Sequence, residues 1–377
     1  MFQHLDDPDT PVLGDSFRER VVGSGRARRQ RTRAAAISLA LVPLLAAGSS
    51  MVYLRSQADE LDRVTVGGLA ALPPADTSST SEPELAPAAP ITAPMNILVV
   101  GVDRRPPGDE VLGSRPDSIG VVRIDPTGGR VSLLSVPRDL WVTDAAGRSD
   151  RINTFLADGP TALVVVVSAT LGVDINHYVE VDFDGFVRLI DLAGGVTIPF
   201  DAASRDERTG FMVESGCQTL DGDEALAYVR SRHLQQFDPA SGESVQDRTS
   251  DLGRVARQQD VIDRLFRQVL AADYGATDQV RLLTDVIDDI TVDDGLDLDG
   301  LRSIFTTASA IGSDRFVTSD LVAGLSGDTI INGNAVLLAD PAVVDAVVGQ
   351  FLDPTPGVEP IESEILDDAI VPTVPAC

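Results

Sequence analysis

An arginine and an aspartate stand at the end of a strongly apolar segment. In VSLLSVPRDLWV, residues 131–142, the apolar run 131–136 is followed by Pro137, Arg138 and Asp139. Ligands of layered α/β proteins bind just outside the carboxyl ends of strands. If 131–136 is a core strand, Arg138 either closes a loop through an ion pair or belongs to a binding site.

Several other arginines share this pattern, each close in sequence to an aspartate or at the boundary of an expected element. They are Arg115 with Asp117 in SRPDS, Arg151 in RIN, Arg230 and Arg232 in YVRSRH, and Arg254 with Asp251 and Gln258 in DLGRVARQQ. Residues two apart share one face of a strand, so a strand would place Arg230 and Arg232 together. Offsets of three and seven place Asp251, Arg254 and Gln258 on one face of a helix.

These residue types suit a phosphate site. Arginine binds phosphate oxygens through paired hydrogen bonds, and Mg²⁺ accepts one or two carboxylates together with substrate phosphates. Arginines and a divalent cation are a common means of stabilising phosphoryl transfer. Taken singly, each residue also has a structural explanation, such as Asp251 capping a helix. The lone histidines His177 and His233 are interpreted as structural.

Charge and cysteine content narrow the function further. The formal net charge is −28 and the chain contains no lysine, which opposes nucleic-acid binding and means that an anion site must use arginine. The two cysteines, Cys217 and Cys377, do not have the spacing of metal ligands. They either form a disulfide that holds the C-terminal tail or remain free thiols, and the sequence leaves both open.

The N-terminal region predicts a membrane anchor. Five arginines between residues 26 and 33 precede the uncharged apolar run 34–54, and about 20 such residues span a bilayer. A cleaved signal peptide is the alternative. The anchor places the disordered tail 1–33 in the cytoplasm and the rest outside, in a single-pass protein of the cell membrane. Residues 55–94, rich in Pro, Ala and Ser, are expected to form an extended linker.

The remaining sequence predicts an α/β domain, with a three-layer α/β/α arrangement around a central mixed sheet. Strands are expected at 97–100, 119–124, 131–136 and 177–181, and helices at 161–172, 183–192 and 253–270. The run 161–172 is β-branched and could be a strand, but its length and Gly172 favour a helix. The core is expected at 95–275, with an acidic extension at 276–352 packed on it and a tail at 353–377.

Seven segments in order resemble the LytR-CpsA-Psr family, membrane-anchored enzymes that attach glycopolymers to bacterial cell walls. They are NILVVGVDRR, RPDSIGVVRID, SVPRDLWV, RIN, DINHYVEVDFDGFVRLIDLAGGV, GCQTLDGDEALAYVRSRH and DLGRVARQQDVI. The resemblance covers roughly residues 95–270. The segment 233–250 and the acidic C-terminal extension look more like those of actinobacterial members. It implies an apolar tunnel for a polyprenyl chain.

The resemblance also implies a role for each matching residue. Asp117, Arg138, Asp251 and Arg254 are implied to be catalytic. Diphosphate binding is implied for Arg115, Arg138, Arg230, Arg232, Arg254 and Gln258, and for Arg151, which stands where the family usually has lysine. Mg²⁺ or Mn²⁺ is implied to bind Asp117, Asp251 and Asp103. Asp139 lies in a family motif without an assigned role.

The expected reaction transfers a glycopolymer from a polyprenyl-diphosphate carrier to a peptidoglycan hydroxyl and forms a phosphodiester. The partners are the lipid-linked glycopolymer, peptidoglycan and the membrane lipid, with no nucleic acid. Hydrolysis of the lipid diphosphate and a non-catalytic lipid-binding or regulatory role are the alternatives. The polar segment 233–250 is either a lid or acceptor-recognition loop or an inert insertion.

Overall fold

The structure is a computed structural model. Residues 57–377 form one compact unit. The described residues are 61–72, 89–103, 116–238, 242–247, 249, 251–272, 285–354, 370–371 and 377. The predicted tail 1–33, the predicted anchor 34–54 and Arg115 lie outside them. Among the described residues, no helix combines the length and hydrophobicity needed to cross a membrane.

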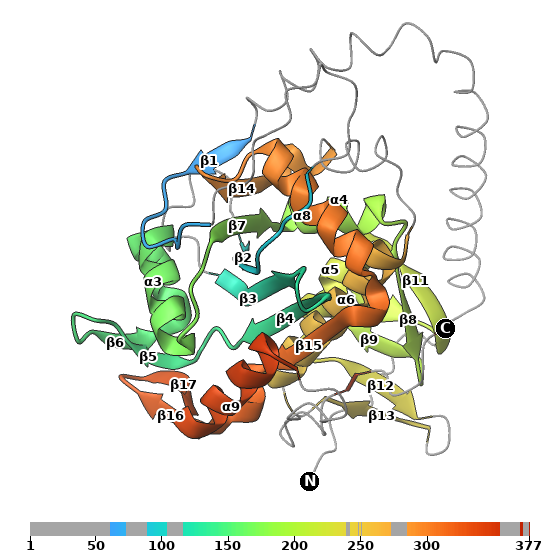
Figure 1. The fold of residues 1–377 in the computed structure, drawn as a ribbon. Helices are drawn as coiled ribbons and strands as arrows, with labels where there is room; N and C mark the ends of the chain where they lie inside the picture. Colours follow the sequence, from blue (N-terminus) through green and yellow to red (C-terminus); the bar gives the residue numbers. More distant parts are fainter. Residues whose placement is uncertain are drawn as a thin grey trace, which may run out of the picture. The chain divides into compact units, whose positions relative to one another are not determined.

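A seven-stranded mixed sheet forms the centre of the fold (Figure 1), in the order β1-β14-β7-β2-β3-β4-β15. Its strands are β1 (Asp62–Val64), β14 (Ile290–Asp293), β7 (His177–Asp182), β2 (Met95–Val102), β3 (Pro116–Asp125), β4 (Arg130–Val136) and β15 (Phe316–Asp320). β2 is parallel to β7, and β3 is antiparallel to both β2 and β4. The four predicted strands and the mixed sheet are confirmed.

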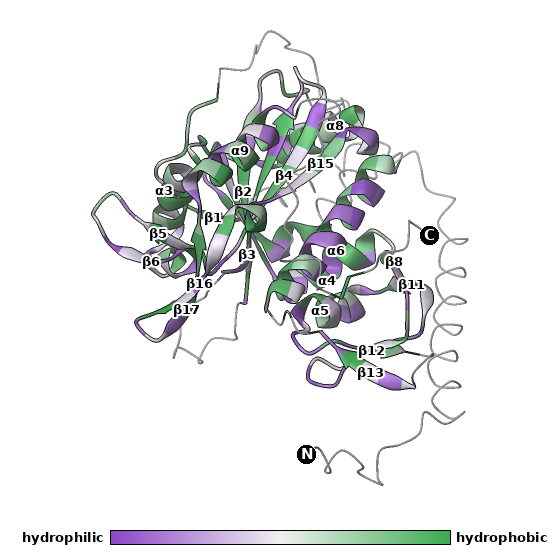
Figure 2. Ribbon diagram, turned by 90° about the horizontal axis from the view of Figure 1, so that it is seen from below, coloured by the Kyte–Doolittle hydropathy of each residue, from purple (hydrophilic) through white to green (hydrophobic). Residues whose placement is uncertain are grey.

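Helices cover both faces of this sheet because residues along its strands alternate between two cores. Leu98 and Val100 pack with α3 (Pro160–Leu171) and α9 (Pro341–Leu352). Ile97 packs on the opposite face with α6 (Asp251–Ala271) and α8 (Leu298–Ile311). Figure 2 shows that α6 carries both hydrophobic (green) and hydrophilic (purple) residues, as expected of a helix with one face on the core.

The ambiguous run 161–172 is a helix, α3. Pro160 occupies its first turn and Gly172 ends it in the left-handed conformation, at φ 63°. Both are strong helix-boundary signals, and they outweigh the β-branched composition of the run. The helices predicted at 183–192 and 253–270 are also confirmed, as α4 (Phe183–Leu192) and α6.

A smaller part of the fold surrounds an aromatic cluster of Phe200, Phe211 and Tyr228. Its elements are α4, α5 (Gly222–Arg230), β8 (Val196–Phe200), β9 (Ser204–Asp206), β10 (Phe211–Val213), β11 (Gly216–Leu220), β12 (Gln235–Asp238) and β13 (Glu243–Gln246). The described residues of the segment 233–250 form the β12–β13 hairpin of a four-stranded sheet.

The acidic region after residue 275 is integral to the sheet. β14 and β15 lie within it, so its described residues complete the core as well as pack on it. The linker prediction for 55–94 is wrong near its start, because β1 pairs with β14. Tertiary pairing outweighs the linker-like composition there, and a protein truncated at residue 95 would lose this strand.

The two cysteines form a disulfide. Cys217 of β11 is bonded to Cys377 across a separation of 160 residues, with a Cα–Cα distance of 5.9 Å. Ile370 packs partly buried against the core that contains Phe200 and Tyr228. The C-terminal tail is therefore fixed to the domain at two described points.

The disulfide is expected to leave no free thiol in the unreduced, denatured chain. Reduction is expected to lower the free energy of unfolding by about 2–4 kcal/mol, because a long loop is released in the unfolded state. Thiol titration and thermal unfolding with and without reductant measure both effects. Two titratable thiols before reduction would contradict the bridge.

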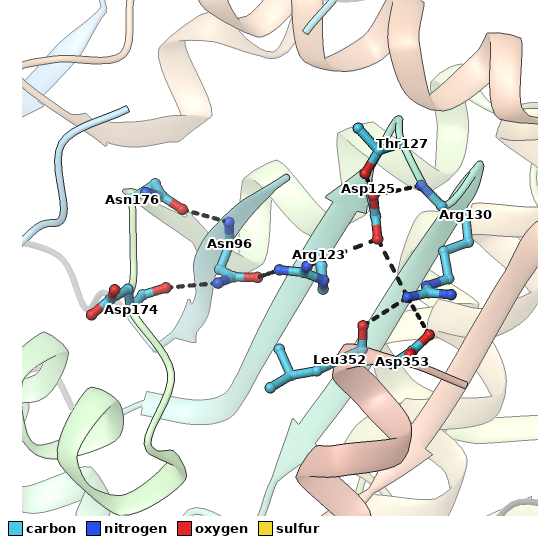
Figure 3. A network of polar contacts seen from close by, with 10 residues as sticks. Asn96, Arg123, Asp125, Thr127, Arg130, Asp174, Asn176, Leu352 and Asp353 are labelled. Atoms are coloured by element: carbon cyan, nitrogen blue, oxygen red, sulfur yellow. Dashed lines mark hydrogen bonds and ion pairs between the residues drawn. The ribbon is translucent and has the colours of Figure 1, made fainter. Parts of the chain in front are cut away.

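A polar network lies at the edge of the sheet where β3 ends (Figure 3). The Asp125 carboxylate accepts from Gly128 N and Thr127 Oγ1, both at 2.7 Å, and lies 3.3 Å from Arg130. Burial raises the pKa of Asp125, but these hydrogen bonds and the charges of Arg123 and Arg130 outweigh it and hold the pKa below its usual value. Each charge is matched within the network, so we interpret it as structural.

Asp125→Asn is expected to lower stability by about 2 kcal/mol at pH 7, since Arg123 loses its carboxylate partner and Arg130 keeps only Asp353. The folded-state pKa is depressed, so this contribution is present above the unfolded pKa of about 3.9 and is lost as pH falls through the lower folded value. Denaturant unfolding from pH 3 to 8 checks this expectation. A pH-independent difference between Asp125→Asn and the unchanged protein would contradict it.

Candidate functional site

The predicted site residues gather at the opposite edge of the sheet. β2 and β4 end there, and β3 begins there because it runs antiparallel to both. Asp103 follows β2, Asp117 is the second residue of β3, and Arg138 follows β4. Three neighbouring strands therefore bring together residues that are 14 to 35 positions apart in the sequence.

Five residues form a continuous series of ion pairs, which we call the arginine–aspartate chain. Its members are Arg254, Asp117, Arg138, Asp139 and Arg151. Arg254 Nη1 lies 3.7 Å from Asp117 Oδ1, which also accepts from Arg138 Nη1. Arg138 Nε lies 3.3 Å from Asp139 Oδ2, and Arg151 Nη1 lies 3.1 Å from Asp139 Oδ1.

Local structure explains how two of these arginines come together. Leu140 N donates to Pro137 O at 3.1 Å, so the chain turns directly after β4. The strand β5 (Trp141–Thr143) then pairs with β6 (Ser149–Arg151), and Trp141 is opposite Arg151. The hairpin thus returns Arg151 to the turn that carries Arg138.

The arginine–aspartate chain carries an excess of positive charge and is partly buried. Three guanidinium groups face two carboxylates, in a protein of net charge −28. The side chain of Arg254 is 3% exposed and that of Asp117 is 29% exposed. Arg151 Nε is buried and has no hydrogen-bond partner among the described residues. The Nε atoms of Arg123 and Arg130 share this feature, so it is the excess of guanidinium groups over carboxylates that suits this site to an anion.

The assumption that Arg230 and Arg232 lie on a strand is wrong. Arg230 is the last residue of α5, and Arg232 follows in the connection after Ser231. The helix forms because Asp221 and Glu224 make a reciprocal capping box at its start, which fixes helical geometry. Both arginine side chains are exposed, and Arg230 Cζ lies 4.8 Å from the ring centroid of Phe183.

The remaining predicted residues have different surroundings. Asp251 is the first residue of α6, but its side chain lies outside the described atoms. Gln258 Nε2 donates to Val229 O at 3.3 Å and so connects α6 to α5. Asp103 follows Val102, which pairs with Pro116, the neighbour of Asp117.

One important residue in the same motif was missed. Arg257 is fully buried; its Nη1 bonds to Asp247 and its Nη2 donates to Ser231 O at 2.7 Å. It also donates to Ile370 O at 3.2 Å. The motif spacing gives only its position three residues after Arg254. Its partners come from segments that no local pattern connects to α6.

The face of the sheet toward α6 is incompletely covered near the site. Val99 and Gly101 of β2, Gly120 of β3 and Ser135 of β4 are half-buried, although central strands of such sheets are usually covered on both faces. Val99 packs on the core shared with α6, and Gly120 and Ser135 share its face by alternation. Three of these four residues are small, and Leu133 lies close to Gly120 on the same face.

The predicted metal ligands are three aspartates, Asp103, Asp117 and Asp251. No three His, Cys, Asp or Glu side chains cluster as a metal site within the described part of the chain. Mg²⁺ needs only one or two carboxylates when substrate phosphates supply the other ligands. Asp117, with Asp103 just after the neighbouring strand β2, fits that limited requirement.

Known proteins resemble this chain in sequence and in fold. The sequence model described as the LytR_cpsA_psr family matches residues 75–348. The polyisoprenyl-teichoic acid–peptidoglycan teichoic acid transferase TagU of Halalkalibacterium halodurans is 32% identical over 212 residues, or 55% of this chain and 63% of that protein. The Bacillus subtilis transferase TagV is 33% identical over 242 residues, or 59% and 58%.

The matched regions thus span less than two thirds of the length of either relative. A solved LytR-Csp2A-Psr enzyme from Actinomyces oris has a similar fold, with a TM-score of 0.58 and 24% identity. The similarity covers 77% of this chain and 95% of that structure. Since the family match extends over most of the sequence and the fold agrees, the chain belongs to the LytR-CpsA-Psr family.

Proposed function

We propose that this protein is a phosphotransferase that moves a glycopolymer from a polyprenyl-diphosphate carrier to a peptidoglycan hydroxyl. The arginine–aspartate chain carries the proposal, because it concentrates guanidinium groups at a sheet edge of an acidic protein. The similarity to TagU and TagV, which are named as teichoic acid–peptidoglycan transferases, supports the same reaction class.

The proposed reaction makes use of the charges that the site presents. The acceptor oxygen forms a bond to the phosphorus that bears the sugar, and the bond from that phosphorus to the bridging oxygen breaks. Polyprenyl phosphate leaves, and the hydroxyl proton is released. Negative charge grows on the leaving phosphate, where Arg138, Arg151 and Arg254 stabilise it.

Mg²⁺ or Mn²⁺ is part of the proposal. Asp117 would hold it, with Asp103 and Asp251 as further candidate ligands, and the metal would neutralise diphosphate charge when bound. Asp117 already pairs with Arg138 and Arg254. We therefore assign Asp117 the role of keeping these two guanidinium groups together at the diphosphate. Arg115, Arg230, Arg232 and Gln258 are proposed to complete the diphosphate site.

The lipid chain is proposed to lie on the half-buried face of the sheet toward α6. Apolar and small residues such as Val99 and Gly120 would contact it, and the diphosphate would lie at the strand ends. The substrate is anchored in a membrane by its lipid, so an uncleaved anchor at 34–54 would bring the enzyme to it. Disulfides persist in oxidising compartments, so the Cys217–Cys377 bridge supports an extracytoplasmic domain.

Product analysis tests this proposal. The full chain is incubated with a short polyprenyl-diphosphate sugar, peptidoglycan fragments and Mg²⁺, with and without chelator, and the products are identified by mass spectrometry. A sugar-phosphate adduct on peptidoglycan, lost with chelator, is the expected result. Free sugar phosphate without adduct would instead indicate hydrolysis. Unchanged lipid that remains bound would indicate a lipid-binding or regulatory protein.

A further inference from the structure

Asp139 lies between two arginines and contacts both. Its Oδ2 is 3.3 Å from Arg138 Nε, and its Oδ1 accepts from Arg151 Nη1 at 3.1 Å. Two guanidinium groups this close repel each other in a partly buried site. A carboxylate with one oxygen toward each group offsets that repulsion and fixes the directions of both.

The backbone around Asp139 is held independently of its side chain. Asp139 O accepts from Leu337 N at 2.9 Å, and Arg138 O accepts from Asn153 N at 3.1 Å. Leu337 belongs to β17 (Asn334–Ala339), which pairs with β16 (Leu325–Ile331). Removing the carboxylate charge therefore leaves these backbone contacts in place.

We infer that Asp139 is the positioning residue that aligns Arg138 and Arg151 on a single diphosphate, with the β16–β17 hairpin supporting its backbone. This inference rests on the proposed function, because it assumes that the bound anion is a diphosphate. Asp139 does not contact the diphosphate in this account. It acts through the two arginines, which it holds side by side.

Binding of geranyl diphosphate to the full chain tests the inference by calorimetric titration. Asp139→Asn keeps the shape of the side chain but removes its charge, and is expected to weaken binding by about tenfold. Asp144→Asn is the matched control, because Asp144 lies in the adjacent β5–β6 turn and contacts Arg148 instead. The control is expected to bind as tightly as the unchanged protein.

A double-mutant cycle separates positioning from a general structural effect. In an Arg151→Ala background, Asp139→Asn is expected to weaken binding by no more than about twofold, because half of its function is already absent. Equal losses in both backgrounds would overturn the inference. So would unchanged affinity in a folded Asp139→Asn variant, and Asp139→Ser replaces that variant if it does not fold. No binding by the unchanged protein would overturn the diphosphate site itself and the inference with it.

Discussion

Arg138→Ala is expected to lower kcat/KM for glycopolymer transfer by about 10²–10³-fold, the usual cost of removing one group that stabilises transition-state charge. Arg138 is the centre of the arginine–aspartate chain, since it contacts both Asp117 and Asp139. Its loss removes a positive charge from the diphosphate. Among the described arginines, Arg254 would then remain paired with Asp117, at 3.7 Å.

Two further variants make this expectation specific. Arg138→Lys keeps the charge but has no guanidinium to contact two carboxylates at once, so an intermediate loss is expected. Arg148→Ala is the control, because Arg148 is 44% exposed and pairs with Asp158, which does not belong to the arginine–aspartate chain. It is expected to retain full activity. An Arg138→Ala variant within about threefold of the unchanged kcat/KM would contradict the account, because the expected loss is far larger.

Arg257→Met is expected to have the largest effect on stability. Arg257 and Asp247 are both fully buried, so the substitution leaves a buried carboxylate without its cation. Breaking such a pair costs about 3–5 kcal/mol. The melting temperature is expected to fall by about 10 °C on that basis. Ser231, which connects Arg230 to Arg232, loses the donor to its carbonyl as well.

Replacing both partners distinguishes the buried charge from simple loss of packing. Arg257→Met with Asp247→Leu is expected to be more stable than Arg257→Met alone, because no buried charge remains unpaired. Arg148→Met serves as the control and is expected to change stability by no more than about 0.5 kcal/mol. Thermal unfolding gives the melting temperatures of Arg257→Met, of the double variant and of Arg148→Met. Equal melting temperatures for Arg257→Met and the unchanged protein would contradict the assignment.

The central strands and α6 were predictable because their patterns are strong. Ile97 and its neighbours form a short continuous apolar run, typical of a strand covered on both faces. The apolar stripe of α6 recurs at helical spacing, and Ile262 and Phe266 contact the sheet core as that stripe requires. Local pattern and tertiary contact agree in these elements.

Weaker elements depend on contacts that the sequence does not display. β14 occupies the acidic stretch DDITVDD, and it is a strand because it pairs with β1 and β7. The spacing of Arg230 and Arg232 fits a strand, yet the capping box nine residues before Arg230 determines a helix there. Cap residues that act through the backbone outweighed the spacing of exposed charges.

The site residues likewise divide into those that the sequence identified and one whose role depends on tertiary contacts. Motif resemblance identified Asp117, Arg138, Arg151 and Arg254, and the structure brings them into one chain of contacts. The bridging position of Asp139 depends on the register of β5 against β6, which places Arg151 opposite Trp141. Register is a tertiary property, so the motif alone gave Asp139 no role.

A crystal structure of the full chain with a polyprenyl diphosphate tests the central claim most directly. We expect diphosphate oxygens within hydrogen-bond distance of Arg138 and of Arg151 or Arg254, with the prenyl chain against Val99 and Gly120. A diphosphate bound instead at the opposite sheet edge, beside Arg123 and Arg130, would contradict the assignment of the site.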